Sequence, residues 1–459
     1  MNIKKSYYTP SVVEAVLLSA ISIFLLSFGI IKFEAAPHIP ILVVIIFLLF
    51  YGLLRKIPFK VMEEGLINGA MAGIGAVILL LFIGLLIGSW MISGTIPTLV
   101  STGFSLATSH YFYAIVFVIT ALVGVSIGSS LTTVATIGVA FISIAQTIDL
   151  SMAITAGAIV SGAFFGDKMS PLSDTTNLAS TIVKVDLFEH IRNMGWTTVP
   201  AFLLSLLFFI FVSPPVEEAD LSNINHFQDS LYSTGLIHWY SWLPLVLLIV
   251  LSIKNVPAIL SLAASSLLAV VLSFINQMLP IGDLLNVLFN GYVSETGNTA
   301  LDELLTRGGV SSMFFTVSLV LLALAMGGLL FTLGIVPRLI ESIAGLLNNV
   351  GSVITASAMT AIGLNVMIGE QYLAILLTGE SFQSQFAKVG LANKNLSRVL
   401  EDAGTVINPL VPWSVCGVFI TSMLEVPVLS YIPFAIFCWL SPILSILFGI
   451  SGKTLTYLK

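Results

Sequence analysis

Long apolar runs with at most one charged residue most constrain how this chain can fold. Ser11–Ile31, Ala70–Ile92 and Met313–Leu333 are examples, and each matches the roughly 20 helical residues needed to cross a hydrocarbon core. Lipid offers the backbone no hydrogen bonds, so these runs are expected to be α-helices. Only 9% of the residues are charged, which is too few for the surface of a soluble protein. The sequence predicts an all-α polytopic membrane protein with about ten membrane-crossing helices.

Several functional classes find no support in the sequence. There is no G-x-x-x-x-G-K-[ST] motif and no long polar segment to house an ATPase, so any pumping must use an ion gradient. Cys416 and Cys438 both lie in apolar segments, which argues against a disulfide framework or a metal cluster. We therefore expect no resident cofactor, no enzymatic activity and no nucleic-acid partner. The partner is the lipid bilayer.

The basic residues predict an orientation. If Lys4 and Lys5 begin in the cytoplasm, alternating crossings leave 14 of the 17 basic residues inside, with Lys32 and Arg307 outside and Lys168 at membrane depth. Basic residues favour the cytoplasmic side of membrane proteins. Both termini are therefore expected to be cytoplasmic.

The two halves of the chain resemble each other weakly at a spacing of roughly 240 residues. Three motifs recur in the same order: G-x5-G-x2-P from Gly88 and Gly328, I-G-x8-[IT]-G-x2-F from Ile127 and Ile368, and G-x4-P-L from Gly166 and Gly404. On the predicted path, Ala70–Ile92 runs outward and Met313–Leu333 runs inward. The repeats are therefore expected to be inverted, which is common in secondary transporters that bind their solute near the midplane.

Each repeat contains a segment that fits a re-entrant hairpin better than two full spans. The first, residues 111–147, has short apolar arms around a tip of small and hydroxyl residues that includes Ser129 and Ser130. The second, residues 351–387, has a tip with Asn365 and Glu370. Non-helical backbone at membrane depth is tolerated where it lines a cavity. Both tips are therefore candidates for binding an ion or a solute.

A helix that should break follows each hairpin. Residues 152–182 contain Gly166 and Pro171, which disrupt a helix, and residues 397–423 contain an Asn-Pro-Leu-Val-Pro segment. Broken helices expose carbonyl groups that coordinate cations. We accordingly divide the chain into N-terminal helices with a linker (1–69), a first repeat (70–192), connecting helices and loops (193–308), a second repeat (309–427) and a C-terminal helix (428–459).

Charged and hydroxyl side chains gather at these breaks and tips. Charges at this depth are costly, so we expect them to be used. Candidates for binding an ion or a substrate are Asp167, Asp174, Thr175, Asn177, Ser129, Ser130, Thr133, Asn365, Glu370, Asp402, Thr405 and Asn408. Lys168 needs a counter-ion, for which Asp167, Asp174, Glu401 and Asp402 are candidates, and we assign Lys168 and Glu401 as charge partners. Oxygen-rich sites suit sodium, which we place at Asp174, Ser129 and Glu370.

Two segments carry a family resemblance. Gly-Asp-Lys-Met-Ser-Pro-Leu-Ser-Asp-Thr-Thr-Asn-Leu-Ala, residues 166–179, resembles the diagnostic segment of bacterial NhaC-type sodium/proton antiporters. Residues 401–413 resemble the second signature of that family. The resemblance implies exchange of cytoplasmic Na+ for external H+ by alternating access in the bacterial plasma membrane. It also implies membership of the larger ion-transporter superfamily, with a mobile transport domain and a scaffold that forms a homodimer.

Two further functions stay open. The chain could be a carrier of a small organic anion or amino acid coupled to Na+ or H+, of the malate/lactate type, with Lys168 and the half-helix N-termini holding the anion. A channel or a membrane sensor is the third possibility, and the inverted repeats with broken helices argue against it. A cavity of a few hundred Å3 beside Lys168 would favour the carrier, because a bare ion needs little volume.

Overall fold

The computed structural model describes residues 7–33, 35–107, 111–214, 229–254, 256–276, 280–296, 301–302, 305–344 and 349–458, so Lys4 and Lys5 lie outside the described residues. Within these ranges the chain is helical, with one isolated β-bridge between Leu391 and Tyr457. Among the described residues, seven helices are long and apolar enough to cross a membrane, and two bent helix pairs raise this number to nine. The prediction of an all-α polytopic membrane protein is confirmed.

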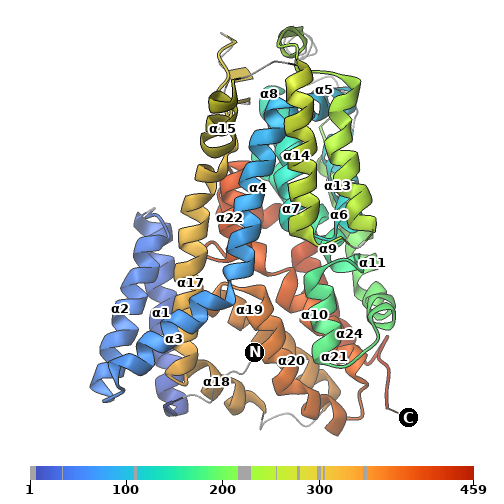
Figure 1. Cartoon of the computed structure of the whole chain (residues 1–459). Coiled ribbons are helices and arrows are strands. Elements are labelled where there is room, and N and C mark those ends of the chain that lie inside the picture. The colour runs from blue at the N-terminus through green and yellow to red at the C-terminus, as the bar shows by residue number, and fades with distance from the viewer. Residues whose placement is uncertain are drawn as a thin grey trace.

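The N-terminal helices form a separate group at one side of the lower half (Figure 1). They are α1 (Val12–Phe33), α2 (His38–Leu54) and the oblique α3 (Phe59–Ala72). Both α2 and α3 pack against α17 (Phe314–Thr332), and the Tyr7 N–H donates to the carbonyl of Thr332 at 3.3 Å. This group therefore attaches to the rest of the molecule through α17.

The first repeat fills the upper half and the centre of the view (Figure 1). It starts with α4 (Ile74–Ile92) and α5 (Thr95–Ala107). The predicted hairpin consists of α6 (Phe112–Ile127) and a return arm made of α7 (Ser130–Thr133), the π-helix η1 (Val134–Gly138) and α8 (Val139–Thr147). The predicted broken helix consists of α9 (Met152–Met169) and α10 (Asp174–Ile182).

The second repeat has the same order of elements. After α17 come α18 (Ile335–Ala344) and a hairpin of α19 (Val350–Ile368) and α20 (Gln371–Lys388). The broken helix consists of α21 (Asn393–Val399), the π-helix η5 (Leu400–Thr405), the 3-10 turn η6 (Asn408–Leu410) and α22 (Val415–Leu424), with a bend of 46°. In Figure 1 the α6–α8 hairpin occupies the upper half and the α19–α20 hairpin the lower half, as inverted repeats require.

The remaining helices enclose the two repeats. They are α11 (Leu187–Val212), α13 (Leu243–Ile253) after the short η3 (Trp239–Trp242), α14 (Ala258–Asn276), α15 (Ile281–Asn290), η4 (Val310–Met313), α23 (Val428–Tyr431), η7 (Ile432–Phe434) and α24 (Ile436–Ser451). α14 packs against α4 and α13, while α24 packs against α9, α11 and α19. The core between them is apolar, with Trp90, Phe117, Phe164 and Phe419 fully buried.

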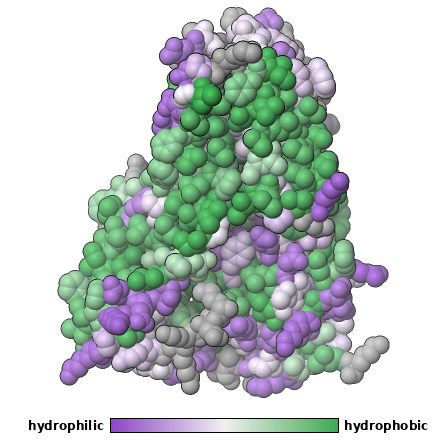
Figure 2. Space-filling view, viewed as in Figure 1, coloured by the Kyte–Doolittle hydropathy of each residue, from purple (hydrophilic) through white to green (hydrophobic). Residues whose placement is uncertain are grey.

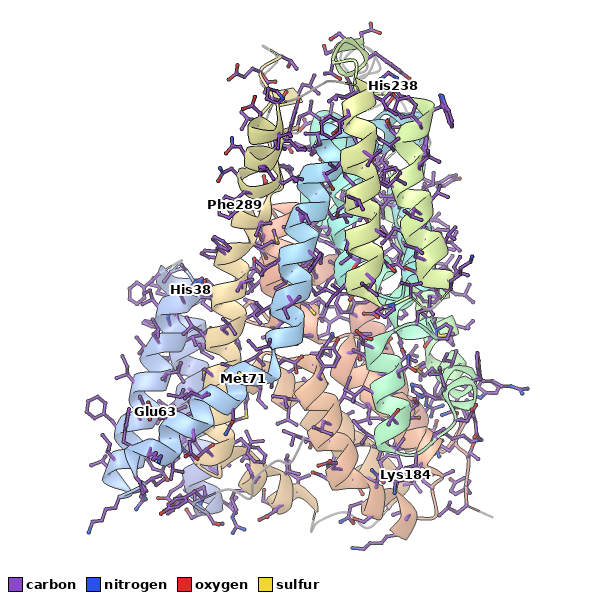
Figure 3. All side chains as sticks on the ribbon, in the orientation of Figure 1. His38, Glu63, Met71, Lys184, His238 and Phe289 are labelled. Carbon is purple, nitrogen blue, oxygen red and sulfur yellow. The ribbon has the colours of Figure 1, made fainter. Side chains whose placement is uncertain are left out.

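The surface has the polarity of a membrane protein. Figure 2 shows an apolar band over most of the visible face, with hydrophilic residues gathered at the lower rim and the upper end. Less apolar residues interrupt the band at mid-height, where α10 and the α19–α20 hairpin lie in Figure 1. Figure 3 places Lys184 and Glu63 near the lower end and His238 near the upper end. The band is the region that lipid would cover, and its interruption leads to the candidate site.

Candidate functional site

The tips of the two hairpins have the same backbone geometry. Gly128 ends α6 with φ of 72°, and Gly369 ends α19 with φ of 74°, a left-handed conformation that favours glycine. The next residue caps the return helix. Ser129 Oγ accepts the Thr132 N–H at 3.3 Å, and Glu370 Oε2 accepts the Leu373 N–H at 2.8 Å. Each hairpin therefore turns within two residues and starts a new helix at its tip.

The break in the first broken helix is fastened to the first hairpin. α9 ends at Met169, and Ser173 caps α10 by accepting the Thr176 N–H at 3.4 Å. Ser170 Oγ donates to the carbonyl of Val125 in α6 at 2.7 Å. Thr176 Oγ1 donates to the carbonyl of Lys168 at 3.1 Å, which satisfies one carbonyl that the break frees. The break is a fixed structure rather than a frayed end.

The structure of the second broken helix changes how the two repeats align at the proline of the break. The sequence motif pairs Pro171 with Pro409, but Pro409 lies within the turn η6, where it is tolerated at the start of a helical turn. The residue that caps the second half-helix is Ser414, which accepts the Gly417 N–H at 3.0 Å as Ser173 accepts that of Thr176. Ser414 follows Ser173 by the same number of positions as Gly369 follows Gly128, so Pro171 corresponds to Pro412.

A cavity of about 770 Å3 lies where both hairpin tips and the first break meet. Seven of the predicted residues line it: Ser129, Ser130, Asp167, Asp174, Thr175, Asn177 and Glu370. Its other wall comes from α4, α13, α14 and α17 and includes Ala76, Ser252, Leu262 and Leu324. The cavity thus lies between the hairpin tips on one side and α4, α13, α14 and α17 on the other. Sequence patterns gave no signal for this wall, because its residues are small or apolar like the rest of their helices.

Three carboxyl groups and no basic side chain face this cavity among its described lining residues. Asp167 and Glu370 are 5% and 6% exposed, whereas Asp174 is exposed to the cavity. Asp167 Oδ2 accepts a hydrogen bond from Ser130 Oγ at 2.7 Å. Thr175 Oγ1 lies 3.0 Å from Ser173 Oγ, and Asn177 Nδ2 donates to the carbonyl of Pro171 at 2.9 Å. An acidic, hydroxyl-lined cavity of this kind suits a hard cation.

Behind the cavity, Lys168 forms a fully buried ion pair. Its Nζ donates to Asp402 Oδ1, and both side chains have no exposed surface. Asp402 Oδ1 also accepts from Thr197 Oγ1 at 3.1 Å, and Lys168 Nζ lies 5.6 Å from the centre of the Phe437 ring. Of the four predicted counter-ions the structure selects Asp402, which therefore acts as a charge partner. Lys168 does not line the cavity. Sequence analysis missed Thr197, one of three hydroxyl residues in the long helix α11.

The two asparagines of the second repeat that were predicted as binding residues bond to the protein itself. Asn365 Nδ2 donates to the carbonyl of Gly404 at 2.7 Å, and Asn408 Nδ2 donates to Asn365 Oδ1 at 2.8 Å. Asn408 Oδ1 accepts the Cys416 N–H at 3.0 Å. Both side chains are fully buried and neither lines the cavity. They join the second hairpin to the second break.

Three other predicted residues are buried away from the cavity. Thr133 Oγ1 donates to the carbonyl of Ser129 at 2.8 Å, which is a common role for a hydroxyl in a membrane helix. Glu401 and Thr405 lie in η5 with no exposed surface. Both oxygens of Glu401 and the Thr405 hydroxyl have no hydrogen-bond partner. Glu401 therefore forms no ion pair with Lys168.

Comparisons with known proteins establish the family of this chain. The model of a family described as "Na+/H+ antiporter family" matches residues 162–453, which include both breaks and the second hairpin. The chain belongs to this family. It is 40% identical over 432 residues to the Na+/H+ antiporter NhaC of Alkalihalophilus pseudofirmus, covering 94% of this chain and 93% of the relative.

Other members of the Na+/H+ antiporter family are also similar over most of their length. The NhaC antiporter of Bacillus subtilis is 39% identical over 422 residues, covering 91% of this chain and 93% of that protein. The malate-2H+/Na+-lactate antiporter of the same organism is 32% identical over 413 residues, covering 89% of this chain and 88% of that protein. The resemblance to NhaC-type antiporters drawn from residues 166–179 and 401–413 is confirmed.

Proposed function

We propose that this protein exchanges cytoplasmic Na+ for external H+ by alternating access in a bacterial plasma membrane. The observation that carries the proposal is the mid-depth cavity, which holds three carboxyl groups, several hydroxyl groups and no basic side chain among its described lining residues. Its relatives named Na+/H+ antiporters are 39% and 40% identical over most of the chain, which supports the same activity here.

The proposed sodium site is formed by Ser129, Asp174 and Glu370. Ser129 and Glu370 come from the two hairpin tips, and Asp174 begins the half-helix α10. All three line the same cavity, although they are far apart in the sequence. Oxygen atoms from a hydroxyl and two carboxylates form a donor set that a hard cation accepts. Na+ and H+ are the cargo, and no prosthetic group is needed for the exchange.

Proton coupling follows from the chemistry of a carboxylate ligand. An ionised carboxylate can ligate Na+, whereas the protonated acid carries its own hydrogen and is a much poorer ligand. The two ions therefore compete for one group. The carboxylates lie in a cavity between the hairpin tips and the helices α4, α13, α14 and α17. A movement of the hairpin tips against these helices would therefore expose the carboxylates to each side of the membrane in turn.

An organic solute is the second candidate. One relative of the chain is a malate-2H+/Na+-lactate antiporter, and a cavity of about 770 Å3 has room for more than a bare ion. An anion would need a positive partner, and the lysine that sequence analysis offered for this role is buried against Asp402. The half-helix N-termini at the cavity are already capped by Ser129, Ser173 and Glu370. These observations favour a cation over an organic anion as the solute that the cavity binds.

Proteoliposomes with Na+ as the only added solute provide the test. We expect an imposed Na+ gradient to drive proton movement in the opposite direction, recorded with an internal pH-sensitive dye. Proton movement that requires an added organic acid would contradict the antiporter proposal and support a carrier of organic anions. Empty liposomes and liposomes with an ionophore set the baseline and the maximum.

Orientation and assembly complete the proposal. The described residues at the lower end include Lys184, and Tyr7 and Leu458 also lie near that end through bonds to Thr332 and Gly390. Basic residues at this end support cytoplasmic termini. The homodimer rests on the family resemblance, and chemical cross-linking in membranes would test it.

A further inference from the structure

The π-helix η5 places two adjacent acidic side chains inside the protein. A π-helical turn holds one more residue than an α-helical turn, and such turns occur frequently at functional sites. Glu401 and Asp402 both have no exposed surface, and η5 packs against α9, α10, α19, α20, α21 and α24. Neither Glu401 nor Asp402 lines the cavity proposed to bind Na+. Glu401 and Asp402 are therefore separate from the proposed Na+ site.

Four oxygen atoms of this turn have no hydrogen-bond partner. They are both carboxyl oxygens of Glu401, Oδ2 of Asp402 and the hydroxyl oxygen of Thr405, and the neighbouring Thr405 hydroxyl is the one polar side chain of this turn that favours the charged form of Glu401. Buried polar atoms in proteins nearly always have a partner, and each exception calls for an explanation. A buried carboxylate without a partner is costly as an ion and much less costly as a neutral acid. The surroundings of Glu401 therefore suit a carboxyl group that carries a proton.

The charges around Glu401 leave it uncompensated. α9 contributes Asp167 and Lys168, and η5 itself contributes Asp402; among the described residues, α10, α19, α20 and α24 contribute no further charge that acts on it. Lys168 pairs with Asp402. Arg398, one turn earlier in the same broken helix, donates to the carbonyl of Thr454 at 3.2 Å. Glu401 therefore faces the negative charge of Asp167 with no free cation beside it.

We propose that Glu401 holds an exchangeable proton of the transport cycle, at a site separate from the Na+ site, and that Asp167 couples the two sites. This inference rests on the proposed function. Asp167 lines the cavity, and its negative charge also acts on Glu401. A cation that enters the cavity offsets the negative charge of Asp167, and Glu401 can then ionise by giving its proton to water. When the cation leaves, the repulsion returns and Glu401 takes up a proton from water.

Parallel measurements of proton release and Na+ binding on purified protein test the assignment. Radioactive Na+ binding gives the number of ions bound, and a pH-indicator dye in weakly buffered detergent solution gives the protons released when NaCl is added. We expect Glu401→Gln to bind as much Na+ as the wild type and to release about one proton fewer per protomer. Glu380→Gln, at an exposed position on α20 outside the cavity lining, is the matched control and should behave as the wild type.

Two outcomes would overturn the inference. Proton release by Glu401→Gln equal to that of the wild type would show that Glu401 carries no transported proton, and the loss of one bound Na+ would make η5 a sodium site instead. If Glu401→Gln fails to fold, infrared difference spectra of the wild type replace it, and the absence of a protonated-carboxyl band that falls on Na+ addition would also overturn the inference. Wild-type protein that binds no Na+ would count against the proposed function itself.

Discussion

Lys168 and Asp402, each with no exposed surface, form an ion pair that joins the two broken helices across the centre of the protein. Lys168 belongs to the first repeat and Asp402 to the second, 234 positions later. The pair is held further by Thr197 of α11 and by the Phe437 ring of α24. Because both broken helices contribute residues to the cavity lining, a shared ion pair would make the two breaks move together.

Removing one member of this ion pair should destabilise the protein more than removing both. Lys168→Met or Asp402→Leu alone leaves a buried unpaired charge, which costs about 3–5 kcal/mol. The double variant leaves no charge and should recover most of the loss. Apparent Tm values in detergent, measured by fluorescence-detected gel filtration after heating, would show this. Lys453→Met, at an exposed position, controls for loss of a lysine. A double variant less stable than either single variant would contradict the pairing.

Asp174 offers the most direct test of the proposed sodium site. Its side chain is exposed to the cavity at the start of α10, so Asp174→Asn should fold normally while losing one charged ligand. We expect sodium-dependent proton flux in everted vesicles to fall to the level of vesicles without the protein. Asp149→Asn is a suitable control, because Asp149 is an exposed turn residue with φ of 53°, which asparagine also adopts. Undiminished flux in Asp174→Asn would remove Asp174 from the site.

Glu370 combines two roles that substitution can separate. Its side chain caps α20 by accepting the Leu373 N–H, and it lines the cavity. Glutamine can still accept this hydrogen bond but carries no charge, whereas alanine loses both functions. Glu370→Gln should therefore keep normal stability and raise the Na+ concentration for half-maximal exchange about tenfold or more, since a lost charged contact costs on the order of 1.5–3 kcal/mol. If the Gln variant exchanges normally and only Glu370→Ala fails, Glu370 is a helix cap alone.

The competition between ions predicts a pH dependence of known sign. Protonation removes a carboxylate ligand, so the Na+ concentration for half-maximal exchange should rise as pH falls. In the limit of full competition at one group, each pH unit raises it about tenfold. Initial rates over a matrix of pH and Na+ concentrations in proteoliposomes would measure this. A half-maximal Na+ concentration that does not change with pH would exclude competition at a shared carboxylate.

The sequence predicted the parts of the site that depend on local chemistry. The hairpin tips were visible because short apolar arms flank small and polar residues, and Gly128 and Gly369 at these tips adopt the left-handed conformation that favours glycine. The first break was visible because Pro171 cannot continue a helix. The prediction that both hairpin tips and the first break meet at mid-depth was enough to place three residues together. Ser129, Asp174 and Glu370 do line one cavity.

What the sequence could not predict depends on distant packing. The repeat motif paired Pro171 with Pro409, three positions before Pro412, because Pro409 repeats the glycine-to-proline spacing of the first half although it is absorbed in the turn η6. Sequence alone left four candidate counter-ions for Lys168, because all four carboxylates were expected at similar depth. The packing of η5 against α9 selects Asp402. Asn365 and Asn408 look like ligands in sequence but satisfy each other.

Gly128 provides a last prediction, on the rigidity of the first hairpin tip. An alanine there would keep φ near 72° against its preference, and its Cβ would lie 2.6 Å from the Cβ of Leu172. We expect Gly128→Ala to cost about 1–2 kcal/mol from the backbone alone, and the clash would push the tip away from the first break. Sodium-dependent flux should fall more than stability does, because Ser129 would move with the tip. Gly363→Ala in α19, where a Cβ meets nothing within 4 Å, should leave both unchanged. Normal flux in Gly128→Ala would mean that the position of this tip does not matter for exchange.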